Sequence, residues 1–282
     1  FIGFFSGLSA GAGVVISQYY GAKDEDKSKK AIHTAITLSL IFGEIVTVIG
    51  LIFSSPILRL ISTPEEIIPL ADDYLKIYFA GAVTIVVYNM GAGIFRALGD
   101  SKHPLYFLIA GALLNTVLDI LFIVVFKLGV KGAAYATVLS QLLSALLTLI
   151  WLMKRKDFCR FCIKELGIDK KVLVNMMRIG VPAGIQSIMY NISNMLVQAR
   201  INGFGTDSAA AWAAYGKLDF IFWMMSNAFG ISITTFVGQN YGAGKIDRAK
   251  KGVRTCMFMT AIATVLLSFV YVIFGRYGFM LF

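Results

Sequence analysis

Charged residues are scarce in this sequence of 282 residues. Only 15% of the residues are Asp, Glu, Lys or Arg, whereas 57% are hydrophobic and the mean hydropathy is +0.75. A water-soluble domain of this size needs far more polar surface. The composition therefore excludes an ordinary soluble protein and indicates that many apolar side chains face lipid.

Cysteine and histidine are also rare, which excludes several kinds of site. Three cysteines do not support a disulfide framework. Cys159 and Cys162 form a C-x-x-C in a segment expected to be cytoplasmic, but neither a second pair nor a nearby histidine completes a zinc site. Two incidental thiols are the favoured interpretation. The sequence also lacks a G-x-x-x-x-G-K-[ST] phosphate-binding loop, which argues against direct use of ATP.

A serine nucleophile is excluded on similar grounds. The sequence GLSAG that begins at Gly7 matches G-x-S-x-G, but that motif requires a strand-to-helix turn and a histidine partner. Here it falls in a continuous apolar segment, and the two histidines, His33 and His103, fall in predicted loops. Because Gly3, Gly7 and Gly11 recur every four residues, we favour a face on which two helices pack closely.

Long apolar runs predict an all-α, polytopic membrane helix bundle. Segments of roughly 20 residues or more give eight candidate spans, at 1–20, 31–54, 70–95, 105–126, 131–153, 172–201, 208–238 and 255–275. The segments between them alternate between two sides, and one side holds 19 of the 26 Lys and Arg, in 21–33, 96–104, 154–178 and 242–254. By the positive-inside rule this side is cytoplasmic. The net charge of +10 therefore reflects topology, and we expect no nucleic-acid partner.

One basic segment occurs twice. QYYGAKDEDKSKK at 18–30 returns as QNYGAGKIDRAKK at 239–251, 221 positions later. An even number of predicted spans separates the copies, so the halves should be parallel repeats. The charged cytoplasmic segment 154–171 is the natural linker between an amino-terminal lobe at 1–153 and a carboxy-terminal lobe at 172–282. Completing both halves needs one further span in front and three behind, which predicts an internal fragment of a twelve-helix (6+6) protein.

Five motifs occur in order along the chain: RALGDSKHP from Arg96, NTVLD ending at Asp119, GVKGAAYAT from Gly129, IGVPAG from Ile179 and GQNYGAG from Gly238. Together they resemble the multidrug and toxic compound extrusion (MATE) family over essentially the whole chain. Members of that family have two six-helix lobes in parallel repeat, which agrees with the repeat in this sequence.

The resemblance implies a secondary active antiporter, not an enzyme, in the plasma (inner) membrane. Such a protein exports small organic compounds, often cationic or amphiphilic, in exchange for H⁺ or Na⁺, and uses no cofactor besides the coupling ion. We expect a monomer in the lipid bilayer. Two alternatives stay open. A lipid-linked precursor flippase of the same wider superfamily would have a larger and more basic central cavity, and a membrane-embedded enzyme would need a catalytic constellation that these residues do not provide.

Asp119 is the strongest candidate for a coupling residue. It lies about 22 Å beyond Pro104 along a helix that rises ~1.5 Å per residue, and so falls within the hydrocarbon. A carboxylate there costs roughly 2.5–3.5 kcal/mol unless it faces a cavity or a partner. Asn115 lies one turn earlier on the same face, and Thr137 should lie at a similar depth in the next span. These oxygen ligands suit a small cation such as Na⁺, and Asp119 also accepts a proton.

The same three residues have a structural interpretation, as polar side chains that pin helices together. The resemblance implies a coupling role, in which such an Asn/Asp/Thr set acts with another Asp on a first helix that this chain lacks. Some family members also carry a Glu in the first helix of the second lobe, and its absence at 172–201 shifts the expected coupling to Asp119. Other polar residues within spans are predicted to line a cavity: Glu44, Asn89, Gln141, Gln186, Tyr190, Asn191 and Asn194.

Overall fold

The computed structural model describes residues 2–60 and 63–279, and every element in these ranges is helical. The elements are α1 (Ile2–Gly21), α2 (Glu25–Leu60), α3 (Ile68–Ala80), α4 (Ala82–Ala97), α5 (Lys102–Asp119), the π-helix η1 (Ile120–Val125), α6 (Gly129–Lys154), the 3-10 helix η2 (Ile163–Glu165), α7 (Lys170–Asn202), α8 (Thr206–Gly242) and α9 (Ile246–Phe279). The predicted all-α fold is confirmed. The first residue of the predicted span 1–20 and the last three residues of the predicted lobe 172–282 lie outside the described ranges.

Six helices in the described ranges are long and apolar enough to cross a membrane, and a seventh span forms if α3 and α4 count as one. The six are α2, α5 with η1, α6, α7, α8 and α9. The remaining predicted span, 1–20, corresponds to α1, which is 20 residues long, is not among these six and is rich in Gly, Ser and Ala. Its small residues are explained by its position, because α1 packs against α7, α8, α4 and α2.

The predicted span 70–95 is not continuous. It breaks at Gly81, and α3 and α4 meet there at an angle of 47°. A Cβ on Gly81 would come too close to the side chain of Val138 on α6, so glycine lets α6 approach. Glycine also weakens a helix, and the hydroxyl of Thr84 donates a hydrogen bond to the Gly81 carbonyl at 2.7 Å, which starts α4 afresh.

The predicted cytoplasmic loops 21–33 and 242–254 are shorter than expected. α2 already begins at Glu25 and α9 at Ile246, so only three residues connect each pair of helices. The basic stretches that follow each turn are rich in Lys, Arg, Asp and Ala. Lys, Arg and Ala favour the helical state, and acidic residues in the first turn stabilise it further.

The two short turns have the same backbone structure, 221 positions apart. Lys23, with φ of 56°, and Gly244, with φ of 70°, both adopt the left-handed conformation. The N–H of Ala22 donates to the carbonyl four residues earlier at 3.0 Å, and the N–H of Ala243 does the same at 3.0 Å. The repeat in the sequence is therefore a repeat in structure.

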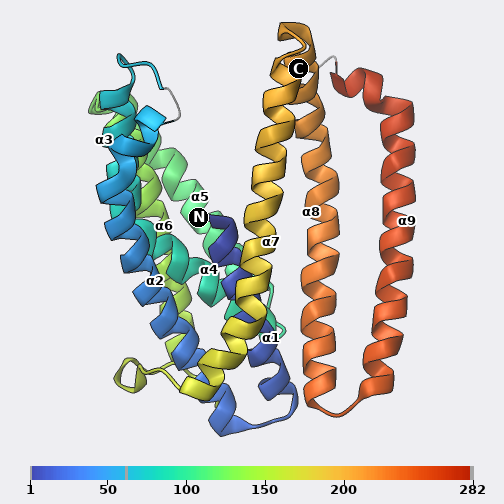
Figure 1. Cartoon of the computed structure of the whole chain (residues 1–282). Helices are drawn as coiled ribbons and strands as arrows, with labels where there is room; N and C mark the ends of the chain where they lie inside the picture. Colours follow the sequence, from blue (N-terminus) through green and yellow to red (C-terminus); the bar gives the residue numbers. More distant parts are fainter. Residues whose placement is uncertain (1, 61–62, 280–282) are drawn as a thin grey trace.

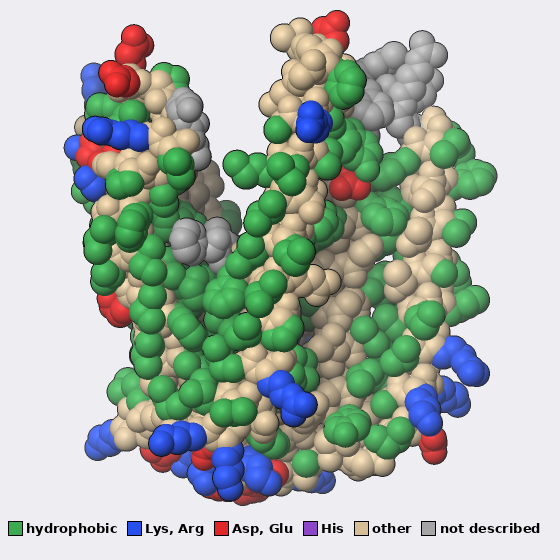
Figure 2. Space-filling model, viewed as in Figure 1, with side chains coloured by type: hydrophobic (Ala, Val, Ile, Leu, Met, Phe, Trp, Pro, Cys, Tyr) green, Lys and Arg blue, Asp and Glu red, His purple; other side chains and the backbone are tan. Residues whose placement is uncertain are grey.

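The described helices form two groups that come together at one end and spread apart at the other (Figure 1). One group contains α2 to α6 and the other α7 to α9, with α1 between them. The turns after α1 and α8 and the connection from α6 to α7 all lie at the joined end, called the charged end below, where many Lys and Arg side chains gather (Figure 2). Hydrophobic side chains cover the flanks, as in a multi-pass membrane protein.

The glycine stripe of α1 packs against α7, as its spacing predicts. A Cβ on Gly7 would overlap the backbone of Gly184, and a Cβ on Gly11 would come equally close to Gly180. Small residues on both helices thus let the two backbones touch. This contact joins the first helix of the chain to the first helix of the predicted carboxy-terminal lobe.

The predicted linker 154–171 packs against the charged end of α2. Cys159 is fully buried in it, and burial raises the pKa of its thiol to about 12. The N–H of Cys162 donates a hydrogen bond to Nε2 of His33 at 3.0 Å. A hydrogen bond from a lysine of α2 holds the pKa of the Glu165 carboxyl below its usual value. The connection between the helix groups is therefore fixed in place.

Candidate functional site

Asp119 closes α5, and the chain continues directly into the π-helix η1. Asp119 and Asn115 are both half-buried. A π-helix widens the hydrogen-bonded ring to i→i+5, and such turns occur frequently at functional sites. The run ILFIVV at 120–125 gave no signal of it, because it reads as ordinary apolar helix. The strongest predicted site residue thus stands where the helix geometry changes.

Contacts at two heights fix the register of α5 and η1 against α6. In η1, the Cβ of Phe122 would lie 3.0 Å from a Cβ on Gly132. Farther along, the hydroxyl of Ser144 donates to the Phe107 carbonyl at 3.1 Å, and Gly111 also faces Ser144. Because the two helices run in opposite directions, these contacts define which residues stand at the same height.

This register places Thr137 level with the turn of α5 between Asn115 and Asp119. Asn115 follows Gly111 by one turn and therefore lies on the side of α5 that faces α6. Thr137 precedes Ser144 by two turns and therefore lies on the side of α6 that faces α5. Asn115 and Thr137 therefore face the same helix interface at a similar height, and the participation of Asp119 stays a prediction.

No hydrogen bond joins these three side chains. The hydroxyl of Thr137 donates to the Ala133 carbonyl of its own helix at 2.9 Å. Within the described ranges, the side chains of Asp119 and Asn115 have no hydrogen-bond partner, so the carboxylate keeps its acceptor positions open. The described residues contain no group of three His, Cys, Asp or Glu that could hold a metal ion. A single carboxylate with neutral oxygens suits a proton or a monovalent cation.

A cavity of about 570 Å³ lies between the two groups of helices. Residues of α1, α4, α7 and α8 line it, so both predicted lobes contribute. Two predicted cavity-lining residues, Asn89 and Gln186, are in the lining. The full set is Ser6, Ser9, Ala10, Gly13, Val14, Asn89, Gly93, Arg96, Ala97, Gln186, Asn227, Gly230, Ile231, Thr234 and Thr235.

The other predicted cavity-lining residues lie elsewhere in the described structure. Glu44 is exposed on α2, and Gln141 is half-buried on α6, where its Oε1 is buried and has no hydrogen-bond partner among the described residues. Tyr190, Asn191 and Asn194 are exposed on the half of α7 that points away from the charged end. Their assignment to a substrate path stays a prediction.

Sequence reasoning missed several residues of the inter-lobe cavity. Arg96 belongs to the RALGDSKHP motif and to the predicted cytoplasmic segment 96–104, yet it lies in the last turn of α4 and lines the cavity. Asn227 was detectable only as a polar residue inside the apolar span 208–238. What brings the two together is the packing of α4 and α8 around α1, which no local pattern encodes.

At the charged end, next to the cavity, the two copies of the repeated segment touch each other. A Cβ on Gly21 would overlap the Gln239 carbonyl, and a Cβ on Gly242 would overlap the Gln18 carbonyl. Both glycines and both glutamines are equivalent positions of the repeat, so the contact is reciprocal, as around a two-fold axis. The side-chain amide of Gln239 also donates to the Ala97 carbonyl at 2.8 Å. These contacts close the space between the helix groups at this end.

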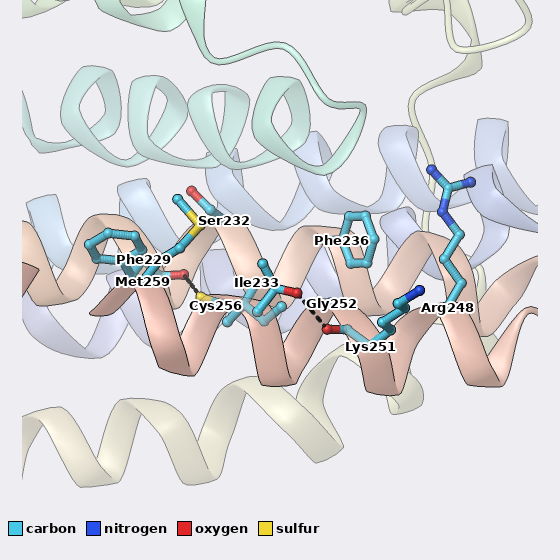
Figure 3. Close-up of a pocket in the computed structure, with 10 residues that line it drawn as sticks. Phe229, Ser232, Ile233, Phe236, Arg248, Lys251, Gly252, Cys256 and Met259 are labelled. Atoms are coloured by element: carbon cyan, nitrogen blue, oxygen red, sulfur yellow. Dashed lines mark hydrogen bonds between the residues drawn. The ribbon is translucent and has the colours of Figure 1, made fainter. Parts of the chain in front are cut away.

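A second hollow, of about 560 Å³, lies between α8 and α9 (Figure 3). Phe229 and Phe236 of α8 and Met259 of α9 form much of its apolar lining, and Arg248 and Lys251 stand at one end. The hollow is a groove on the surface of a helix pair and contains no carboxylate among its described lining residues.

The repeat shows that this groove is a helix-packing surface. Six of the equivalent residues, 221 positions earlier, are at most 7% exposed: Leu8, Ala12, Val15, Ala31, Ala35 and Leu38. All of them except Leu8 belong to one buried cluster with residues of α4. α4 packs against α1 and α2 in that repeat. The groove between α8 and α9 therefore matches the surface that α4 covers, which leaves the inter-lobe cavity as the candidate substrate site.

Comparisons with known proteins place these features in context. The MatE family profile matches residues 1–121 and 182–282. The probable multidrug resistance protein YoeA of Bacillus subtilis (strain 168) is 34% identical over 279 residues, which cover 96% of this chain and 60% of that protein. YpnP, a probable multidrug resistance protein of the same organism, is 35% identical over 253 residues, covering 88% of this chain and 55% of that protein.

Solved structures give the same picture of the fold. A multidrug resistance MATE family transporter of the MOP superfamily, solved in an outward-facing conformation, aligns with a TM-score of 0.86 at 25% sequence identity. The alignment covers 99% of this chain and 63% of that one. This chain thus spans about 60% of the length of the relatives it matches.

Proposed function

Because this chain belongs to the MatE family, we propose that it provides the ion-coupling lobe and part of the second lobe of a secondary active antiporter, which exports organic amphiphilic compounds in exchange for H⁺ or Na⁺. The observation that carries this proposal is a cavity lined by both helix groups and closed at the charged end by the reciprocal contact of the repeats. Transporters built from repeats alternate access by rocking one lobe against the other around such a site.

Asp119 is the proposed coupling residue. Its carboxylate has no hydrogen-bond partner among the described residues, and it stands next to Asn115 at the height of Thr137. A carboxylate can hold a proton or a cation but not both at once, so binding of one ion displaces the other. At a membrane potential of roughly 150 mV, one inward charge supplies about 3.5 kcal/mol, enough to sustain a concentration gradient of several hundredfold.

The cavity also bears on the flippase alternative. About 570 Å³ is within the range that encloses a drug-sized ligand. A lipid-linked precursor has a much larger polar headgroup and would need a wider and more basic chamber. The volume favours small organic compounds as substrates, and membership of a transporter family fits a protein that is not an enzyme.

Gradient-driven loading of everted membrane vesicles tests the proposal. We would join the chain to the segments of YoeA that lie outside the matched region, and impose a proton or Na⁺ gradient on the vesicles. The expected result is accumulation of a cationic or an anionic test dye that stops when an ionophore collapses the gradient. A chimera that inserts as well as YoeA but accumulates no dye under either gradient would contradict the proposal.

A further inference from the structure

The inter-lobe cavity has one cationic side chain and no carboxylate among its described lining residues. That cation is Arg96, which is half-buried in the last turn of α4. Arg155, at the charged end, is paired with Asp157. By contrast, the guanidinium of Arg96 has neither an ion-pair partner nor a hydrogen bond within the described part of the chain.

Two carboxamides reach the same cavity from other helices. Gln186 belongs to α7 and Asn227 to α8, and neither side chain has a hydrogen-bond partner in the described ranges. Ser9 and Asn89 differ, because they already donate to backbone carbonyls at 3.0 and 2.8 Å. The open hydrogen-bond donors of the cavity thus include groups from α4, α7 and α8, and therefore from both helix groups.

We propose that this cavity binds the anionic group of an amphiphilic compound, a carboxylate, sulfonate or phosphate, against Arg96. The planar guanidinium presents paired N–H donors that match the oxygens of such a group, and the two carboxamides can add further donors. A half-buried guanidinium without a counter-ion is costly, and a bound anion lowers that cost. A cationic compound would find no carboxylate in this lining and would be repelled by Arg96.

The rest of the lining suits the apolar part of the same compound. Val14 and Ile231 contribute apolar surface from α1 and α8, beside the polar groups of α4 and α7. The inference rests on the proposed function, since it names the substrate class of the same cavity. It differs from the cationic compounds that the family resemblance implied.

Equilibrium binding of two related dyes tests the inference. The whole chain would be placed in nanodiscs of neutral phosphatidylcholine, and fluorescence anisotropy would follow sulforhodamine B, which carries sulfonates, and rhodamine 6G, which is cationic. We expect the sulfonated dye to bind about tenfold more tightly. Arg96→Gln should weaken its binding about tenfold, and Arg96→Lys less, because lysine keeps the charge but lacks the planar fork.

The matched control is Arg200→Gln, on the exposed far end of α7, which should change neither dye. Circular dichroism and gel filtration would show that the variants are folded. Replacing part of the lipid by phosphatidylglycerol distinguishes two sources of the anion. If the anionic lipid displaces the dye and the displacement depends on Arg96, the site binds a lipid headgroup. If the lipid does not displace the dye, the site binds a diffusible compound. Both of these outcomes support an anion site.

Two results would overturn the inference. One is binding of rhodamine 6G at least as tight as that of sulforhodamine B, and the other is unchanged binding of the sulfonated dye to Arg96→Gln. The measurement uses no ion gradient. Failure of transport and failure of anion recognition are therefore separate outcomes.

Discussion

Gly21 lies so close to Gln239 that a Cβ on the glycine would overlap the glutamine's carbonyl oxygen. The equivalent residues of the repeat, Gly242 and Gln18, make the same contact. At both positions, glycine lets α1 and α8 meet backbone to backbone at the charged end. The contact between α1 and α8 at the charged end therefore depends on these small residues. A larger side chain there should measurably increase the distance between the two helices.

A disulfide placed beside this contact should form readily. A Cβ on Gly238 would lie 3.1 Å from the Cβ of Ser17, slightly closer than the roughly 3.5–4.5 Å of disulfides, so a small shift suffices. In a background without native cysteines, Ser17→Cys with Gly238→Cys should cross-link on mild oxidation, detected after proteolysis of the linker. The control pairs Ser17→Cys with Gly216→Cys, since a Cβ on Gly216 would meet no heavy atom within 4 Å. Equal cross-linking of both pairs would contradict the contact.

A larger side chain at Gly21 should push the helices apart. We expect Gly21→Val to destabilise the folded protein by about 1–3 kcal/mol and to slow the cross-link, because the valine side chain would overlap the backbone of α8. Gly216→Val, on α8 in open space, should do neither. Thermal unfolding and the rate of cross-linking measure the two effects. A melting temperature for Gly21→Val that equals that of Gly216→Val would count against a tight contact.

Much of this fold can be predicted from short-range patterns in the sequence. Hydropathy located six of the eight predicted spans and the bent pair α3–α4. The repeat placed both basic turns at one end, and the spacing of Gly7 and Gly11 predicted the packing of α1. These features follow from the periodicity of one helix or from charge near its ends, and both are local properties of the sequence.

The features that were missed depend on distant partners. The break at Gly81 follows from the approach of Val138, which is far away in the sequence. Arg96 and Asn227 line one cavity only because α4 and α8 pack around α1. The register of α5 and α6 supports the height predicted for Thr137, but whether Asp119 binds an ion depends on its surroundings in three dimensions.

The two linker cysteines should differ strongly in reactivity. Cys159 is fully buried and its pKa is raised to about 12, whereas Cys162 is half-buried. At pH 7.5, a thiol with a pKa of 12 ionises about a thousandfold less than an ordinary thiol, and only the thiolate reacts. In single-cysteine variants, a polar maleimide should label Cys162 in the folded protein and Cys159 only after denaturation. Rapid labelling of native Cys159 would show that the linker does not pack as described.

The start of α7 should depend on pH through Asp169. Its carboxylate accepts hydrogen bonds from the N–H groups of Val172 and Lys171 at 3.0 and 2.9 Å, and these bonds lower its pKa. A lowered folded-state pKa gives stability that is present above the unfolded value of about 3.9 and lost as the pH falls through the folded value. Asp169→Ala should therefore melt at a lower temperature than the parent at pH 7, and the difference should shrink below about pH 4. Thermal melts across this range measure it, and a difference independent of pH would contradict the charged cap.

The central claim is that Asp119 couples ion movement to export. Gradient-driven dye loading of everted vesicles that contain the chimera with YoeA tests this claim most directly. Asp119→Asn keeps the shape of the side chain but removes the charge and the proton-accepting oxygen. Asp207→Asn, in the exposed first turn of α8, is the matched control. With insertion matched by blotting, Asp119→Asn should load no more dye than vesicles without the protein, Asn115→Ala and Thr137→Ala should lose less, and Asp207→Asn should match the parent. If Asp119→Asn loads dye like the parent, the three residues only hold helices together and the coupling site lies elsewhere.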